Sequence, residues 1–442
     1  MHINNTDFHI AINNISQQLT SLSAIAEPTI IQLFSPIKSL SALAWLNQQQ
    51  QFPKLYWQNR SAESEAATIG KILEYWLHDD LPFSQPILAK LPWRFYGGHG
   101  FAVGDPQVTA MGGNRFYLPR FEYRREREQS WFICNLLLEP AEQVQQIAAA
   151  KQELSQLTAL QFATKEVQIK QRQHAPEYNL WAKLVRQITE NCQQEKLSKV
   201  VLARTTKLTC QQVSNLWQLL AAWQHQQSNC YHFAIQTSAE QGFFGCSPER
   251  LFCRRQQELE TEALAGTSDH AAKLASLDSA KNQHENQLVV QDVLQQLTPL
   301  SEQITTETKP RIIKLQYINH LCCSIKARLK PNISDAKLLA ALHPTAAICG
   351  LPRAAAQQFI RQYEPIERGW YAGVFGVMGE DFSEFCVTLR SVMQQGCQLN
   401  LYAGAGIVIG SEPAEEWQEL NSKLASANNI INPSENYDEH LF

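Results

Sequence analysis

Two ionisable side chains, Lys199 and Glu249, stand in settings that could change their affinity for protons. Lys199 lies at the start of LSKVVLARTTKL (197–208), whose alternation predicts a strand with two largely apolar faces. A lysine there either reaches water at the edge of the sheet or lies in a polar cavity. Glu249 follows a Ser-Pro turn in FFGCSPERLFCRR, so we expect it at the bend of a β-hairpin. The two side chains are candidates for a base and an acid, although an ordinary turn acid facing solvent is the alternative for Glu249.

Two predicted helices carry acids beside apolar residues. Glu285 shares a face of the helix expected over 271–297 with leucine, valine and aspartate side chains. Glu416, Glu419 and Lys423 fall at i, i+3 and i+7 on one face of a helix near the C-terminus. Because Mg²⁺ prefers a few carboxylates plus water, a shared Mg²⁺ site is plausible. Acids on a helix surface, or acids near a helix start, are the alternative interpretation.

Small and hydroxyl side chains mark two further candidate positions. Gly404 and Gly406 lie in a strand expected over 399–408, where missing side chains let a ligand approach the backbone. A bulge or a crowded sheet crossing would explain them equally. Thr267 ends the segment ETEALAGT with a hydroxyl that either faces a ligand or bonds its own backbone.

Alternating strands and helices must position these residues. Patterns of period two and of 3.6 residues predict strands over 54–57, 116–124, 231–237, 243–246, 370–376, 385–392 and 399–408, and helices over 140–160, 178–192 and 354–363. Ser411 is a plausible N-cap for the last helix, and Pro413 fits its first turn. We expect the boundary between two halves of the chain to lie between the helices at 140–160 and 178–192.

The composition limits the class of protein. The 442 residues are 44% hydrophobic and 18% charged, which is typical of a soluble globular protein. A net charge of −4 gives no basic face for nucleic acid, and the basic run 120–127 is interleaved with glutamates, as in a solvated hairpin. Eleven cysteines without a C-x-x-C pair predict reduced thiols. No signal peptide or membrane-spanning run is evident, so we expect a cytoplasmic protein without membrane contact.

Nine short motifs together resemble the chorismate-binding enzymes, and within them most closely the isochorismate synthases of the menaquinone pathway. They are KVVLAR, SPERLF, EALAGT, KNQHENQLVV, LHPTAAICGLPR, RGWYAG, FCVTLRS, LYAGAGIV and EWQEL. The resemblance is close over residues 175–435, the expected catalytic region. It is weak over residues 1–165, where LYWQNRSAESEAATIG carries it, and that part would belong to the same fold.

The resemblance implies an α+β fold of two large, mainly antiparallel β-sheets packed face to face with flanking helices. Chorismate would be the substrate and Mg²⁺ the cofactor, held by Glu285 and Glu419. The implied substrate-binding residues are Arg390 and Tyr371 at the enolpyruvyl carboxylate, the amides around Gly404 and Gly406, and Thr267 and His343 in the pocket.

The chemistry of this reaction agrees with the acid–base candidates. Conversion of chorismate to isochorismate adds water at ring C2 and expels the C4 hydroxyl, so it needs a base and an acid. We expect Lys199 and Glu249 to supply them, in environments that shift the proton affinity of both.

Related families have different residues at two of these motif positions. Aminodeoxychorismate synthases carry a lysine in P-I-K-G-T where this chain has Ala265, and anthranilate synthases have glutamine where Lys199 stands. We therefore expect no amidotransferase subunit. Salicylate synthase, which also eliminates pyruvate, is the alternative function, followed by an isochorismate synthase for siderophores and by a non-catalytic binding subunit. Monomer and homodimer both stay open.

Overall fold

Most of the chain can be described in the structure, a computed structural model of residues 1–442. The described residues are 5–38, 40–75, 92–102, 115–158, 167–269, 279–314, 318–380 and 382–432.

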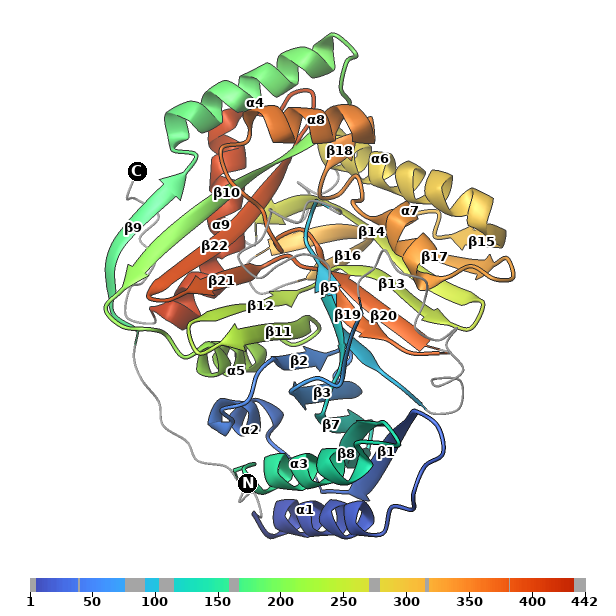
Figure 1. Cartoon of the computed structure of the whole chain (residues 1–442). Coiled ribbons are helices and arrows are strands. Elements are labelled where there is room, and N and C mark those ends of the chain that lie inside the picture. Colours follow the sequence, from blue (N-terminus) through green and yellow to red (C-terminus); the bar gives the residue numbers. More distant parts are fainter. Residues whose placement is uncertain are drawn as a thin grey trace.

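Two antiparallel β-sheets form the centre of the molecule (Figure 1). The first, sheet A, has 12 strands among the described residues. Its strand order is β1 (Thr29–Pro36), β8 (Gln129–Leu138), β7 (Phe121–Glu126), β3 (Ser64–Ile69), β2 (Lys54–Gln58), β11 (Tyr231–Ser238), β12 (Gln241–Ser247), β21 (Ser391–Gln395), β22 (Gln398–Ile407), β10 (Lys199–Cys210) and β18 (Gly350–Leu351), with β9 (Ile169–Ala175) also paired to β10.

The second, sheet B, has 10 strands in the described part of the chain. Its order is β15 (Ser301–Thr306), β17 (Ile318–Leu329), β14 (Glu258–Asp269), β13 (Arg250–Arg255), β20 (Phe382–Val387), β19 (Val374–Met378), β5 (Phe95–His99), β6 (Arg115–Leu118) and β4 (Leu73–Tyr75), with β16 (Arg311–Lys314) paired to β17.

Aromatic side chains pack the two sheets against each other. Phe375 of sheet B stacks on Trp57 and Phe233 of sheet A, with ring centroids 6.2 and 5.5 Å apart. Phe243 of sheet A contacts Trp370, which in turn contacts Phe375. All five rings are buried, and such pairs stabilise a core beyond the area they bury. The expected α+β fold with two sheets packed face to face is confirmed.

Strands from the N-terminal third take part in both sheets. In sheet A, β2 pairs with β11, and in sheet B, β5 pairs with β19. The division of the chain at residues 165–175 stays a prediction, and the backbone hydrogen bonds of both sheets cross it.

Helices cover the outer surfaces of the sheets (Figure 1). They are α1 (Asn5–Thr20), α2 (Ala42–Gln48), α3 (Gln143–Ser155), α4 (Tyr178–Gln193), α5 (Leu216–Gln226), α6 (Ala280–Leu297), α7 (Asp335–Leu342), α8 (Arg353–Tyr363) and α9 (Pro413–Ile431), with a 3₁₀ turn at Thr298–Leu300. Two of them bear on the site, because α6 packs on β14 and α9 packs on β22. None of the helices in the described ranges is both long and apolar enough to span a membrane.

Several local expectations were wrong. The strands expected over 116–124 and 385–392 are each divided between the two sheets, into β6 and β7 and into β20 and β21. The strands on either side of Glu249 do not form a hairpin: β12 belongs to sheet A and β13 to sheet B, so the chain crosses between the sheets there. The basic run 120–127 does enter a hairpin, β7–β8, but it is not solvated throughout, since Arg124 is buried against Glu122. The N-cap of α9 is Glu412 rather than Ser411, although Pro413 does begin the helix.

Candidate active site

Two crossings of the chain between the sheets lie side by side and carry two of the expected site residues. The first connects β12 to β13 and contains Glu249; the second connects β20 to β21 and contains Arg390. Backbone hydrogen bonds link them, from the Val387 N–H to the Glu249 carbonyl at 3.1 Å and from the Cys246 N–H to the Arg390 carbonyl at 3.0 Å. Arg390 has φ +47°, an uncommon backbone conformation for a residue with a side chain, and such strain is concentrated at functional sites.

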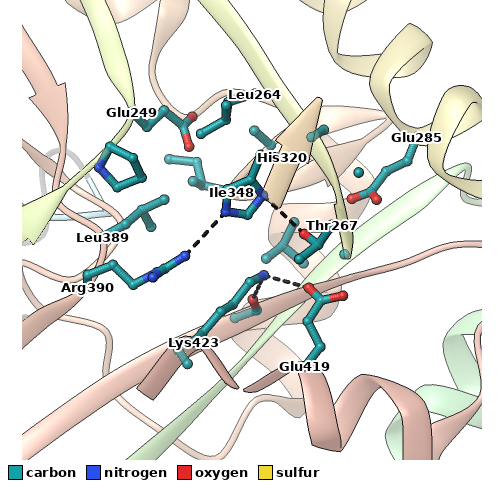
Figure 2. Close-up of a pocket in the computed structure, with 18 of the residues that line it drawn as sticks. Glu249, Leu264, Thr267, Glu285, His320, Ile348, Leu389, Arg390, Glu419 and Lys423 are labelled. Atoms are coloured by element: carbon teal, nitrogen blue, oxygen red, sulfur yellow. Dashed lines mark hydrogen bonds and ion pairs between the residues drawn. The ribbon is translucent and has the colours of Figure 1, made fainter. Parts of the chain in front are cut away.

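A pocket lies beside these crossings, between the two sheets (Figure 2). It is lined by Val201, Pro248, Glu249, Leu264, Ala265, Gly266, Thr267, Glu285, His320, Ala347, Ile348, Tyr371, Leu389, Arg390, Tyr402, Ala403, Gly404, Gly406, Glu419 and Lys423. Eight of the ten expected site residues are in this set. Lys199 adjoins it, because its Nζ lies 2.9 Å from Oε1 of Glu285.

His343 is not among the residues that line this pocket, and its expected role there stays a prediction. The ring is buried and its Nε2 lies 2.9 Å from the carbonyl oxygen of Ala372. It packs edge-on against His99, with ring centroids 4.7 Å apart. His343 thus holds the backbone at Ala372, the residue that follows Tyr371.

His320 occupies the pocket instead. It lies on β17 directly opposite Thr267 of β14, and Nδ1 of His320 is 3.2 Å from Oγ1 of Thr267. Nε2 is 3.3 Å from Nη2 of Arg390. Burial and then the positive charge of Arg390 hold the pKa of His320 well below its usual range, so its ring is neutral. No sequence pattern marked His320, because its place opposite Thr267 depends on the pairing of β17 with β14.

Glu249 is almost completely buried in the pocket wall. Burial raises its pKa to about 8, while the nearby Lys199 ammonium lowers it and the Glu262 carboxylate adds to the rise. The carboxyl group therefore carries a proton at neutral pH and has a proton to donate.

Glu285 and Glu419 of the pocket lining, and Glu416 three residues before Glu419 on α9, each pair with a lysine. Glu285 pairs with Lys199, Glu419 with Lys423 at 2.6 Å and Glu416 with Lys281 at 2.6 Å. Burial alone would raise the pKa of Glu285, but the ammonium groups of Lys199, Lys423 and Lys281 outweigh it and lower the pKa. Burial and the charge of Glu419 raise the pKa of Glu416 to about 7. The sequence singled out Glu416 and Lys423 without assigning them a role.

The donor set fits Mg²⁺ in part. Within the described ranges, no group of three or more carboxylate, histidine or cysteine ligands is arranged around one point. Glu285 and Glu419 do both face the pocket, and Mg²⁺ is commonly held by one or two carboxylates, with water and substrate oxygens completing its shell. The two glutamates therefore suit a metal that binds together with an anionic substrate.

The two glycines of β22 provide space for neighbouring side chains. A Cβ at Gly406 would overlap Oε1 of Glu285 and lie 2.8 Å from Cε of Lys199. A Cβ at Gly404 would lie 2.8 Å from the Tyr371 hydroxyl. Their backbone is part of the pairing with β10, and the Gly404 carbonyl accepts a hydrogen bond from Lys423 at 2.7 Å. The absent side chains thus allow the expected metal and substrate residues to reach the pocket.

Residues 16–432 match the family described as chorismate binding enzyme, and the chain belongs to that family. Among its relatives, isochorismate synthase MenF of Escherichia coli is 36% identical over 442 residues, covering 95% of this chain and 97% of the relative. The salicylate biosynthesis isochorismate synthase of Pseudomonas aeruginosa is 31% identical, covering 98% and 96%.

Solved structures agree with the family assignment. The menaquinone-specific isochorismate synthase MenF from Escherichia coli superposes with a TM-score of 0.85 at 34% identity, over 96% of this chain and 100% of the other. Anthranilate synthase component I from Streptococcus pneumoniae has a TM-score of 0.63 at 16% identity, over 93% of each chain, and shares the fold.

Proposed function

We propose that this protein is an Mg²⁺-dependent isochorismate synthase that supplies isochorismate for menaquinone biosynthesis. The similarity to the MenF enzymes of Escherichia coli and Haemophilus influenzae, the latter 32% identical over 94% of this chain, supports the reaction and the pathway. The proposal also assigns roles to individual site residues, a bound Mg²⁺ and a mechanism.

One observation carries the mechanism: a carboxyl group with a raised pKa lines the pocket, and a lysine adjoins the same pocket. Glu249 and Glu285 stand at opposite sides of the view in Figure 2, with His320 between them. Lys199 contacts Glu285, and its charge also acts on Glu249. Adding water at one ring carbon while a hydroxyl leaves another requires both a base and an acid at the substrate.

The protons balance between the two residues. Neutral Lys199 takes a proton from the water that attacks ring C2, and Glu249 donates its proton to the hydroxyl that leaves C4 as water. One water enters and one leaves, so the substrate is isomerised. Lys199 contacts the Glu285 carboxylate, and this contact has to open before the lysine can take a proton from water.

The remaining residues bind the dianionic substrate. Arg390 would bind the enolpyruvyl carboxylate through its planar guanidinium group, next to the Tyr371 hydroxyl. Glu285 and Glu419 would hold the Mg²⁺, which supplies positive charge that offsets a substrate carboxylate. Thr267 and the neutral His320, which are hydrogen-bonded to each other, add polar groups to the pocket lining.

The reaction is tested by incubating the protein with chorismate and Mg²⁺ and separating the products by chromatography. We expect isochorismate as the product, no pyruvate in a coupled lactate dehydrogenase assay, and pyruvate release once an isochorismatase is added. Salicylate fluorescence with stoichiometric pyruvate before that addition would identify a salicylate synthase. No turnover under any condition would favour a non-catalytic binding protein.

Partners and location follow from the same proposal. We expect turnover without a glutaminase subunit and without added ammonia, because the attacking nucleophile is water. All eleven cysteines are free thiols, which supports a location in the reducing cytoplasm.

A further inference from the structure

Arg60 connects the N-terminal third of the chain to the turn that carries Glu249. It lies between β2 and β3, and only 19% of its side chain is exposed. Its Nη1 donates hydrogen bonds to the Pro248 carbonyl at 3.0 Å and to Oε2 of Glu262 at 2.8 Å. Its Nη2 donates to Oε1 of Glu262, so the guanidinium group grips that carboxylate with both nitrogens.

Glu262 is a buried carboxylate on β14 that keeps its charge. Burial would raise its pKa, but the hydrogen bonds and charge of Arg60, followed by the charges of Arg250 and Arg311, outweigh burial and lower it. The carboxylate is close enough to Glu249 for its negative charge to favour the protonated form of that acid. The charge of Glu262, and whatever neutralises it, therefore acts on the proton that Glu249 holds.

We propose that Arg60 is a positioning residue for Glu249: it holds the Ser247–Glu249 turn through the Pro248 carbonyl and screens Glu249 from the charge of Glu262. The inference rests on the proposed role of Glu249 as the acid. It gives the weakly matching N-terminal third a part in the reaction, through a residue that the pocket lining does not include.

Other groups also act on Glu249, and the Arg60–Glu262 pair opposes some of them. Lys199 from β10 and Lys423 from α9 favour the ionised carboxylate. Tyr371 and Cys386 also face Glu249, and burial raises the pKa of both, so they are neutral. Arg390 and neutral His320 line the same pocket. The two lysines lower the pKa of Glu249 and Glu262 raises it. The extent to which Arg60 neutralises Glu262 therefore affects the pKa of Glu249.

The test is the pH dependence of kcat/KM in Arg60→Gln, Glu262→Gln and the double variant. Activity that needs protonated Glu249 is lost as the pH rises through its pKa. Arg60→Gln removes the arginine that binds Glu262 and leaves only Arg250 and Arg311 to offset its charge, so this loss should move up by about 0.5 to 1 pH unit. Glu262→Gln leaves the positive charge of Arg60 without its partner. The alkaline loss of activity should then move down by a similar amount. The double variant should return close to the wild-type position.

Two additional variants separate charge from contact. Arg60→Lys keeps the positive charge but cannot bind the Pro248 carbonyl and both oxygens of Glu262 as the guanidinium group does. The alkaline loss should therefore stay at the wild-type pH, while kcat falls about tenfold and KM is nearly unchanged. Arg94→Gln is a matched control, because Arg94 is an arginine of similar exposure that pairs with Glu126. It should leave the pH profile unchanged.

The outcomes distinguish this inference from the proposed function. Unshifted profiles in Arg60→Gln and Glu262→Gln, whatever their melting temperatures, would reduce Arg60 to a structural residue while the reaction assignment stands. If Arg60→Gln does not fold, Arg60→Lys decides, because a positioning role predicts a tenfold loss of kcat with KM and the alkaline loss unchanged, and wild-type kcat in this variant would overturn it. An active Glu249→Gln that keeps the wild-type alkaline loss would overturn both the acid and the role of Arg60.

Discussion

The Nζ of Lys199 lies 2.9 Å from Oε1 of Glu285, so the proposed base and a proposed metal ligand are bound to each other. Lys199 is on β10 and Glu285 on α6, two elements that meet at the pocket. Only 1% of the lysine side chain and 13% of the glutamate side chain are exposed. A substitution of either residue therefore leaves a buried charge without this partner, which is costly.

We first predict that Glu285→Gln and Glu419→Gln lose turnover by at least about 100-fold and bind Mg²⁺ more weakly. Each change removes a negative oxygen ligand while the size of the side chain is nearly kept. Calorimetric titration with Mg²⁺ in the presence of chorismate measures the second effect directly. Glu415→Gln, at an exposed position on the same helix as Glu419, is the matched control and should behave like wild type. Wild-type Mg²⁺ affinity in either variant would remove that residue from the metal site.

A second prediction concerns Lys199→Gln, which should fold and bind chorismate with Mg²⁺ but form no isochorismate. Glutamine keeps a hydrogen-bonding group beside Glu285 and cannot accept a proton from water. Product chromatography and equilibrium binding of chorismate separate the two effects. Lys207→Gln on the same strand, outside this pocket, is the control. Near-normal isochorismate formation by Lys199→Gln would mean that another group activates the water.

Arg390→Lys should lower kcat/KM by about 100-fold although the positive charge is kept. An ammonium group cannot reproduce the planar, two-bond grip of a guanidinium on a carboxylate. A loss of order 10² is also what a misplaced substrate costs in general. Steady-state kinetics at saturating Mg²⁺ measure the change, with circular dichroism to confirm the fold. A loss of only a few-fold would show that the enolpyruvyl carboxylate is bound elsewhere.

The buried carboxyl of Glu249 should make the stability of the protein depend on pH in a defined direction. Its pKa is about 8 in the folded protein, above its ordinary value of 4.5. Between these values the folded state keeps a proton that the unfolded state has released, so this contribution to stability is complete below about pH 4.5 and is lost as the pH rises through 8. Glu249→Gln lacks the titration. The melting temperature of wild type minus that of the variant should therefore fall between pH 5 and pH 8.5, and a constant difference would contradict the raised pKa.

Local pattern was sufficient to predict only part of the strands and helices, since β5, β17 and α5 among others were missed, and it did not predict how the strands pair. The Ser-Pro turn before Glu249 has the sequence of a hairpin bend. The structure instead pairs β12 with β11 and β21, and β13 with β14 and β20. The pairings with β21 and β20 join strands more than 100 residues apart in the chain, and an alternating pattern does not specify them. The crossing places Glu249 between the sheets, which explains its burial.

The two histidines show the same limit at the level of the site. His343 precedes a proline and lies in a motif of the family, whereas His320 lies in a strand that the sequence pattern did not indicate. His320 lines the pocket because the register of β17 against β14 places it opposite Thr267. Arg60 was missed for the same reason, because its contact with Glu262 joins residues 202 positions apart.

The last prediction uses the two glycines of β22 as a pair of matched substitutions. Gly406→Ala puts a methyl group where Glu285 and Lys199 meet, while Gly404→Ala puts one against the Tyr371 hydroxyl. Both positions are on β22 and pair with β10, Gly404 opposite Ala203 and Gly406 opposite Val201. Gly406→Ala should therefore weaken Mg²⁺ binding and abolish turnover, and Gly404→Ala should mainly raise the KM for chorismate by displacing Tyr371. Calorimetry with Mg²⁺ and steady-state kinetics on both variants measure the two effects. Equal effects of the two variants on Mg²⁺ binding would show that the metal and the enolpyruvyl carboxylate are not separated along β22.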